Sequence, residues 1–126
     1  MLKIDMRNAF NLVSRQAMLD ECATHFPELL PWASWCYGQH PLLRHHLGTM
    51  SSEVGVQQGD PLSLLFFCLV LHILVSAIAA DEGCSSLLFH AWYQDDGAIA
   101  GPRQAVSRAL SIIQEQGPAL SVNCSA

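Results

Sequence analysis

A run of nineteen residues, 62–80, is almost wholly apolar and constrains the fold of this chain more than any other feature. Its length is close to that of a helix that crosses a bilayer. Asp60 and Asp81 flank the run, however, and neither flank carries a Lys or Arg that would anchor or orient a membrane span. Pro61 also stands where a helix of a water-soluble domain begins. The run therefore favours a long buried core helix, with a membrane span as the alternative.

The rest of the composition indicates one small intracellular domain. The chain has 126 residues, 51% of them hydrophobic, which is enough for one core, so we expect a single domain. The formal net charge is -5 and the six basic residues are scattered, which counts against autonomous binding of nucleic-acid phosphates. Five cysteines form no CxxC pair, and the first ten residues show no signal-peptide pattern. We therefore expect a reducing location, the nucleus or the cytoplasm.

The six histidines give no clear metal-binding pattern. His45 and His46 are adjacent, so on an extended segment their side chains would point to opposite faces. The other histidines are isolated in the sequence, and solvated or core positions suffice to explain them. We expect no metal site built from histidine.

The order of predicted elements indicates an α+β fold, with helices packed on one face of an antiparallel sheet. Ser14 and Asp60 are expected to cap the helices that follow them, and Gly38 to end a helix. Asp95 and Asp96 are expected at the tip of a tight hairpin, because Asp and Gly favour turns. The expected elements are a strand over 2–5, helices over 15–25 and 28–37, a hairpin within 39–56, a helix over 61–80, strands over 87–93 and 98–100, a helix over 102–117 and a strand over 120–122.

Two acidic positions, Asp5 and the pair Asp95-Asp96, each stand where a strand meets a turn. In an antiparallel sheet these positions can be neighbours. Gathered carboxylates repel one another, and a hard divalent cation such as Mg²⁺ relieves the repulsion while leaving room for substrate phosphates. Two such ions about 3.5–4 Å apart support in-line phosphoryl transfer. The alternative is that Asp95-Asp96-Gly97 is only a hairpin turn.

Three segments resemble, in order, the first three palm motifs of reverse transcriptases, in the form found in retroelements without long terminal repeats and in group II introns. They are KIDMRNAFN at 3–11, QQGDPLS at 57–63 with the apolar residues 64–71 after it, and WYQDDG at 92–97. Three motifs in order are a stronger signal than paired aspartates alone. We interpret residues 1–126 as the palm segment of an RNA-directed DNA polymerase, without its fingers and thumb.

The resemblance implies a catalytic centre that transfers a nucleotide to the 3′-hydroxyl of a primer. Asp5 and Asp95 would bind both of two Mg²⁺ ions, and Asp96 would be a third supporting carboxylate. Mn²⁺ could replace Mg²⁺. The implied partners are an RNA or DNA template with its primer, deoxynucleoside triphosphates and the remaining polymerase domains of an intact element, with no membrane.

The resemblance also implies four nucleotide-binding residues. Phe10 matches the bulky residue that excludes a ribose 2′-hydroxyl, although a core aromatic would look the same. Gln58 and Gly59 match the residues that support the incoming nucleotide and the templating base. Tyr93 matches the aromatic residue near the primer end.

We expect this segment to be inactive by itself, because the basic fingers and the thumb would lie outside it. Two positions also depart from the family pattern: Leu64 stands where relatives often have proline, and Ala126 stands about where the family has a lysine. The alternative to a polymerase segment is a degenerate or co-opted retroelement remnant that acts as a non-catalytic binding module, which the acidic charge and Ala126 would suit.

Overall fold

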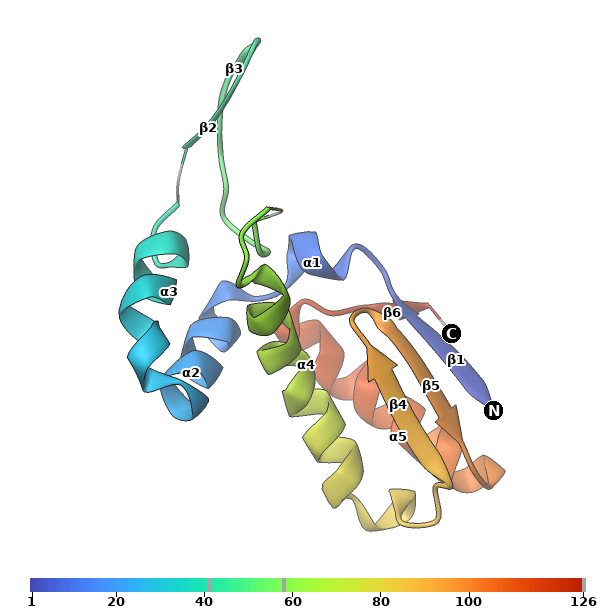
Figure 1. The fold of residues 1–126 in the computed structure, drawn as a ribbon. Coiled ribbons are helices and arrows are strands. Elements are labelled where there is room, and N and C mark those ends of the chain that lie inside the picture. The colour runs from blue at the N-terminus through green and yellow to red at the C-terminus, as the bar shows by residue number, and fades with distance from the viewer. Residues whose placement is uncertain (41, 58, 126) are drawn as a thin grey trace.

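The computed structural model describes residues 1–40, 42–57 and 59–125 (Figure 1). Gln58 and Ala126, which the resemblance singles out, lie outside the described residues. The elements are, in chain order, β1 (Leu2–Met6), α1 (Ala9–Leu12), α2 (Arg15–His25), η1 (Pro27–Leu29), α3 (Leu30–Tyr37), β2 (Leu42–His45), β3 (Gly48–Ser51), α4 (Ser63–Ala80), η2 (Glu82–Cys84), β4 (Phe89–Tyr93), β5 (Asp96–Ala100), α5 (Arg103–Gln116), η3 (Gly117–Leu120) and β6 (Cys124–Ser125).

A four-stranded antiparallel sheet in the order β4-β5-β1-β6 forms one layer, and α4 and α5 pack against it (Figure 1). Side chains alternate between the two faces of a strand. Ile4, Met6 and Ile99 are therefore buried on the helical side, while Lys3 and Asp5 are exposed on the other. The predicted α+β class, with helices on one face of an antiparallel sheet, is confirmed.

The apolar run folds as α4, which contacts both α2 and α5. Phe66, Val70 and Leu74 recur at a spacing of four residues and are fully buried, so one side of the helix forms the centre of the core. The side chain of Leu64 is 42% exposed and lies on the side of α4 that faces solvent. α4 is still long and apolar enough to cross a bilayer by length and composition, with 39% of its residues buried in the fold. Its buried side places it in the predicted role of a core helix.

The first helices follow the sequence closely. α2 has the predicted bounds, and the Ser14 hydroxyl accepts a hydrogen bond from the backbone N–H of Ala17 at 3.3 Å. α3 ends at Tyr37 with Gly38 as its C-cap, as predicted, but it begins at Leu30, two residues later than predicted, because residues 27–29 form η1. α4 begins two residues later than predicted, because the Asp60 carboxylate accepts from the backbone N–H of Leu62 (2.9 Å) in a turn ahead of the helix.

Two predictions for the second half of the chain were wrong: the extent of the hairpin turn and the strand over 120–122. Asp96 and Gly97 belong to β5, so the turn contains only Gln94 and Asp95. Residues 120–122 form no strand; the chain continues from α5 into η3, and the last strand is β6. In the first case pairing with β1 extends the strand, and in the second the N–H of Val122 returns to the carbonyl of Gly117 at 2.9 Å.

The β2–β3 hairpin stands away from the main sheet as a separate two-stranded unit (Figure 1). Its base is tied to α2 by Arg15, a buried charged residue. The Arg15 guanidinium donates to the carbonyl of Gly55 (2.8 Å) and to the carbonyl and hydroxyl of Ser52 (2.6 and 2.8 Å), and it lies over the ring of Tyr37. Burial lowers the pKa of Arg15, but an arginine keeps its charge. Its hydrogen bonds satisfy the loop carbonyls that lead toward α4.

Candidate functional site

Asp5 and Asp96 lie directly opposite each other on neighbouring strands. In the antiparallel pair of β1 and β5, the Cα of Asp5 is the partner of the Cα of Asp96. Residues opposite each other in such a pair project from the same face of the sheet. Both side chains are exposed on the face that the helices leave open. The prediction that the first strand end and the hairpin are neighbours is confirmed.

Tyr93 extends this row onto a third strand. Its Cα is the partner of Asp96, so Tyr93, Asp96 and Asp5 follow one another across β4, β5 and β1. Tyr93 is 75% exposed, and its ring is therefore available at the edge of the carboxylate pair. The aromatic and acidic residues that the resemblance selects from two distant motifs thus share one row of the sheet.

Asp95 occupies the turn and is fixed by its backbone. Its carbonyl accepts a hydrogen bond from the backbone N–H of Met6 at 3.0 Å, which ties the turn to the end of β1. Gln94 before it has a φ of 56°, a left-handed conformation that costs energy for a residue other than glycine. Asp95 and Phe10 line the same cavity, of about 380 Å³, together with residues 8, 9 and 11.

The donor set of the three aspartates suits Mg²⁺, because that ion prefers oxygen ligands. Asp5, Asp95 and Asp96 do not themselves converge to within 4.8 Å; within the described residues, the group of three possible ligands that does is a different one. The Lys3 ammonium lies 4.0 Å from the Asp96 carboxylate, and because both side chains are well exposed, this pair stabilises the fold by at most about 1 kcal/mol.

The Phe10 ring packs against the core and also lines the cavity. Its ring stacks on Phe67 of α4, with centroids 4.3 Å apart and planes inclined by 24°. The side chain is only partly buried, and it forms part of the wall of the cavity that Asp95 also lines. The two readings of Phe10, as a core aromatic and as a wall of the nucleotide site, are therefore compatible.

The loop before α4 is held from α3. The Tyr37 hydroxyl donates a hydrogen bond to the Asp60 carboxylate and accepts one from the backbone N–H of Gln57 at 3.2 Å. Burial, and then the bond to Asp60, raise the pKa of Tyr37 far above its usual value. Gly59 has a φ of 93°, which only glycine adopts readily, and no atom lies within 4 Å of where its Cβ would be. Gly59 therefore presents bare backbone to open space.

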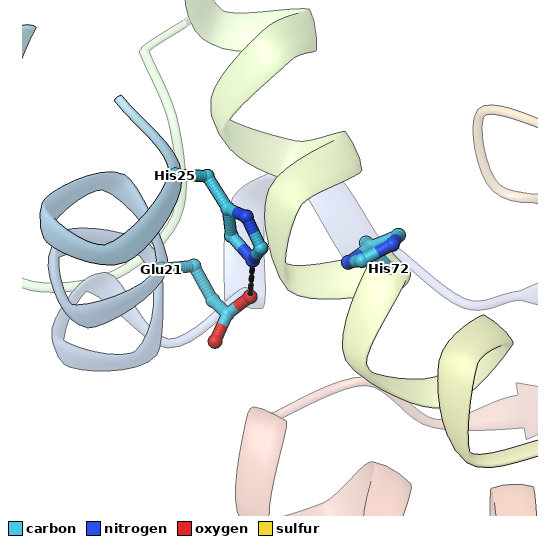
Figure 2. A group of neighbouring side chains, drawn as sticks. All are labelled: Glu21, His25 and His72. Carbon is cyan, nitrogen blue, oxygen red and sulfur yellow. Dashed lines mark ion pairs between the residues drawn. The ribbon is translucent and has the colours of Figure 1, made fainter. Parts of the chain in front are cut away.

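One cluster of possible ligands was missed by the sequence reasoning. Glu21 and His25 of α2 meet His72 of α4, 47 positions further along the chain (Figure 2). His25 and His72 were predicted to be isolated. This was wrong, because the packing of α2 on α4 brings the two residues together although they are far apart in the sequence. The only local signal was the spacing of Glu21 and His25, which places both on one side of a helix.

No protein-family model matches the sequence, and no curated protein matches it. Of the seven residues selected by the resemblance, the structure brings Asp5, Asp96 and Tyr93 into one row and Asp95 and Phe10 to one cavity. Gly59 lies in the loop before α4, and Gln58 is outside the described part of the chain.

Proposed function

We propose that this chain is the palm segment of an RNA-directed DNA polymerase and that Asp5, Asp95 and Asp96 are its metal ligands. The observation that carries the proposal is the pairing of Asp5 with Asp96 across β1 and β5. Two carboxylates 91 positions apart lie side by side on an open sheet face, beside the turn that carries the third. If Asp95-Asp96-Gly97 formed only a hairpin turn, there would be no reason for a carboxylate at Asp5.

The residues of the chain would perform three tasks in nucleotidyl transfer. Asp5 and Asp96 present oxygen ligands on the open face of the sheet, and Asp95 is held beside them by its carbonyl bond to Met6. Mg²⁺ ions, when bound, would stabilise the attacking and leaving oxygens of the phosphoryl displacement. Phe10 narrows the neighbouring cavity, where a bulky ring would obstruct a ribose 2′-hydroxyl.

The acidic charge of the chain means that a polymerase segment of this kind would need basic residues supplied by a larger enzyme. A net charge of -5 would repel a duplex, and phosphate contacts normally come from clustered Lys and Arg. We propose that such residues belong to the remaining polymerase domains, which would also complete the electrostatic support of the transferred group. Template, primer and deoxynucleoside triphosphates would then bind between those domains and the open sheet face.

Primer extension tests this proposal. With Mg²⁺, a primed template and deoxynucleotides, we expect extension by the chain embedded in its complete reading frame and none by the chain alone. Asp95→Asn in the same frame should reduce extension by several orders of magnitude, whereas Asp20→Asn, an exposed acid on α2, should leave it unchanged. Equal extension by the Asp95→Asn and unsubstituted proteins would contradict the proposal.

A non-catalytic binding module is the second candidate, and the β2–β3 hairpin favours it. Leu42, Leu47 and Met50 are more than half exposed on this projecting unit, as expected of a surface that contacts another protein. Calorimetric titration of the chain with Mg²⁺ separates the two candidates. Heat that disappears in Asp95→Asn supports the polymerase segment, and no detectable heat supports the binding module.

A further inference from the structure

Glu21, His25 and His72 form a compact cluster on the surface between α2 and α4. One ligand atom from each lies within 4.8 Å of the others (Figure 2). Glu21 and His25 are one helical turn apart, with 3.3 Å between a carboxylate oxygen of Glu21 and Nε2 of His25. The rings of His25 and His72 meet edge to face, with centroids 5.4 Å apart. The cluster lies on a different pair of elements from Asp5, Asp95 and Asp96.

The orientation of His72 is supported from its own helix. Nε2 of His72 lies 3.1 Å from the hydroxyl oxygen of Ser76, one turn further along α4. A histidine that donates one ring N–H to such a partner presents the other nitrogen with its lone pair. Metal-binding histidines are commonly oriented in this way. In the tautomer that carries the proton on Nε2, this N–H donates to Ser76 and Nδ1 keeps its lone pair for a metal.

We propose that Glu21, His25 and His72 form a binding site for Zn²⁺ that joins α2 to α4. Two imidazoles and one carboxylate are ligands of Zn²⁺, whereas Mg²⁺ and Ca²⁺ prefer oxygen ligands alone. The His25 side chain is 42% exposed and that of Glu21 22%, so water can reach the site and complete a tetrahedral set. The site is separate from the proposed polymerase centre and does not depend on it.

The site would join two helices that lie between Asp5 and Asp95 in the chain. α2 begins directly after the loop that follows α1, and α4 begins directly after the Gly59 loop. A metal that binds the folded chain and joins these helices raises the unfolding temperature, because binding favours the folded state. The effect requires all three ligands, since each helix alone offers at most two.

Calorimetric titration of the full metal-free chain with ZnCl₂ tests the site. We expect a saturable binding event that is retained in Asp95→Asn, and a rise in the unfolding temperature with Zn²⁺. His72→Gln and His25→Gln should each weaken binding by at least about 10-fold, and Ser76→Ala by about 10-fold. His40→Gln, which changes an exposed histidine in the loop after α3, is the matched control and should bind as tightly as the original chain.

The five free cysteines require a second measurement, because thiolates also bind Zn²⁺. With Co²⁺ in place of Zn²⁺, a site of nitrogen and oxygen ligands gives no thiolate charge-transfer absorption. Thiolate absorption, or unchanged affinity in folded His72→Gln and His25→Gln, would overturn the proposal, and so would the absence of saturable binding. Asp95→Asn should leave Zn²⁺ binding unchanged, so failure here is distinguishable from failure of the proposed polymerase function.

Discussion

At the scale of single residues, the loop before α4 depends on a buried hydroxyl. Tyr37 is 2% exposed, and its hydroxyl group connects the Asp60 carboxylate with the backbone N–H of Gln57. A buried donor and acceptor without partners cost free energy. Tyr37 therefore packs in the core and also holds Gln57 and Asp60 in place ahead of α4.

Tyr37→Phe should lower the free energy of unfolding by about 1–3 kcal/mol, because Asp60 and Gln57 lose their shared partner. The raised pKa of Tyr37 keeps its hydroxyl protonated in the folded chain, so its contribution is fully present below the unfolded value of about 10. It is lost as pH rises from there toward the folded pKa. Urea denaturation at pH 7 and above pH 10 should show the difference between the two proteins shrinking at the higher pH.

Tyr93→Phe is the matched control, because Tyr93 is 75% exposed and its ring lies on the open sheet face. Its stability should match that of the original chain at pH 7. A loss in Tyr93→Phe as large as that in Tyr37→Phe would show that the hydroxyl of Tyr37 has no special role.

Residue roles could be predicted where the partner is near in sequence. Ser14 caps α2 through a residue three positions away, so a local pattern was sufficient to find it. Arg15 and Tyr37 bind loop residues 20 to 40 positions away, and their roles had no local signal. The same holds for His72. The position of Asp5 beside Asp96 was predicted because strand ends and turns can be recognised locally and meet in an antiparallel sheet.

At the scale of elements, the packing of the β4–β5 hairpin explains why the turn was predicted to extend too far. Asp96-Gly97 has the composition of a turn, yet Gly97 is buried in β5 beneath Trp92 of β4. A Cβ at Gly97 would lie 2.5 Å from a ring carbon of Trp92. The glycine is therefore required by close packing across the strands, which no turn preference reveals.

Gly97→Ala should destabilise the chain by about 1–3 kcal/mol, because the indole of Trp92 would have to move away from the new methyl group. Denaturation followed by near-ultraviolet circular dichroism would report both the loss and the altered tryptophan environment. The same substitution in a Trp92→Leu background should cost less, since the smaller side chain leaves room. Equal costs in both backgrounds would contradict the proposed contact.

An ion pair joins the end of α4 to α5. Nε and Nη2 of Arg108 donate to one oxygen of the Asp81 carboxylate, at 3.0 and 2.8 Å. These bonds hold the pKa of Asp81 below its usual range. A carboxylate with a lowered folded pKa stabilises the chain above its unfolded pKa, about 3.9, and loses this effect as pH falls through the folded value.

Arg108→Gln should therefore lower the unfolding temperature at pH 7, and the difference from the original chain should disappear in strong acid. Thermal unfolding followed by circular dichroism between pH 7 and pH 2 measures this. Arg103→Gln changes an exposed arginine at the start of α5 and should give little change at either pH. A difference that grows on acidification would contradict the assigned direction of the Asp81 pKa shift.

At the scale of the whole molecule, α4 organises the fold. The length of its apolar run, with Pro61 at the start, predicted a buried helix. Which side is buried could not be predicted, since that depends on where α2 and α5 pack. The strand order of the main sheet, with β1 between β5 and β6, could not be predicted either, because it depends on contacts between the two ends of the chain.

Leu74→Ala and Leu64→Ala test whether α4 is the core helix of one cooperative unit. Leu74 is fully buried, so its truncation leaves a cavity and should cost about 2–5 kcal/mol. Leu64 is 42% exposed near the start of the same helix, and its truncation should cost less than about 1 kcal/mol. A domain is typically stable by only about 5–15 kcal/mol, so the first variant should shift the urea midpoint strongly.

Circular dichroism and tryptophan fluorescence should give the same midpoint for each variant if sheet and helices unfold together. A helix that spanned a bilayer would have no reason to distinguish these two leucines, because lipid and core are similarly apolar environments for them. An equal loss of unfolding free energy in the two variants would therefore contradict the position of α4 at the centre of the core. It would also leave the carboxylate row without its support, since Ile4 and Met6 of β1 pack in the same cluster as Leu74.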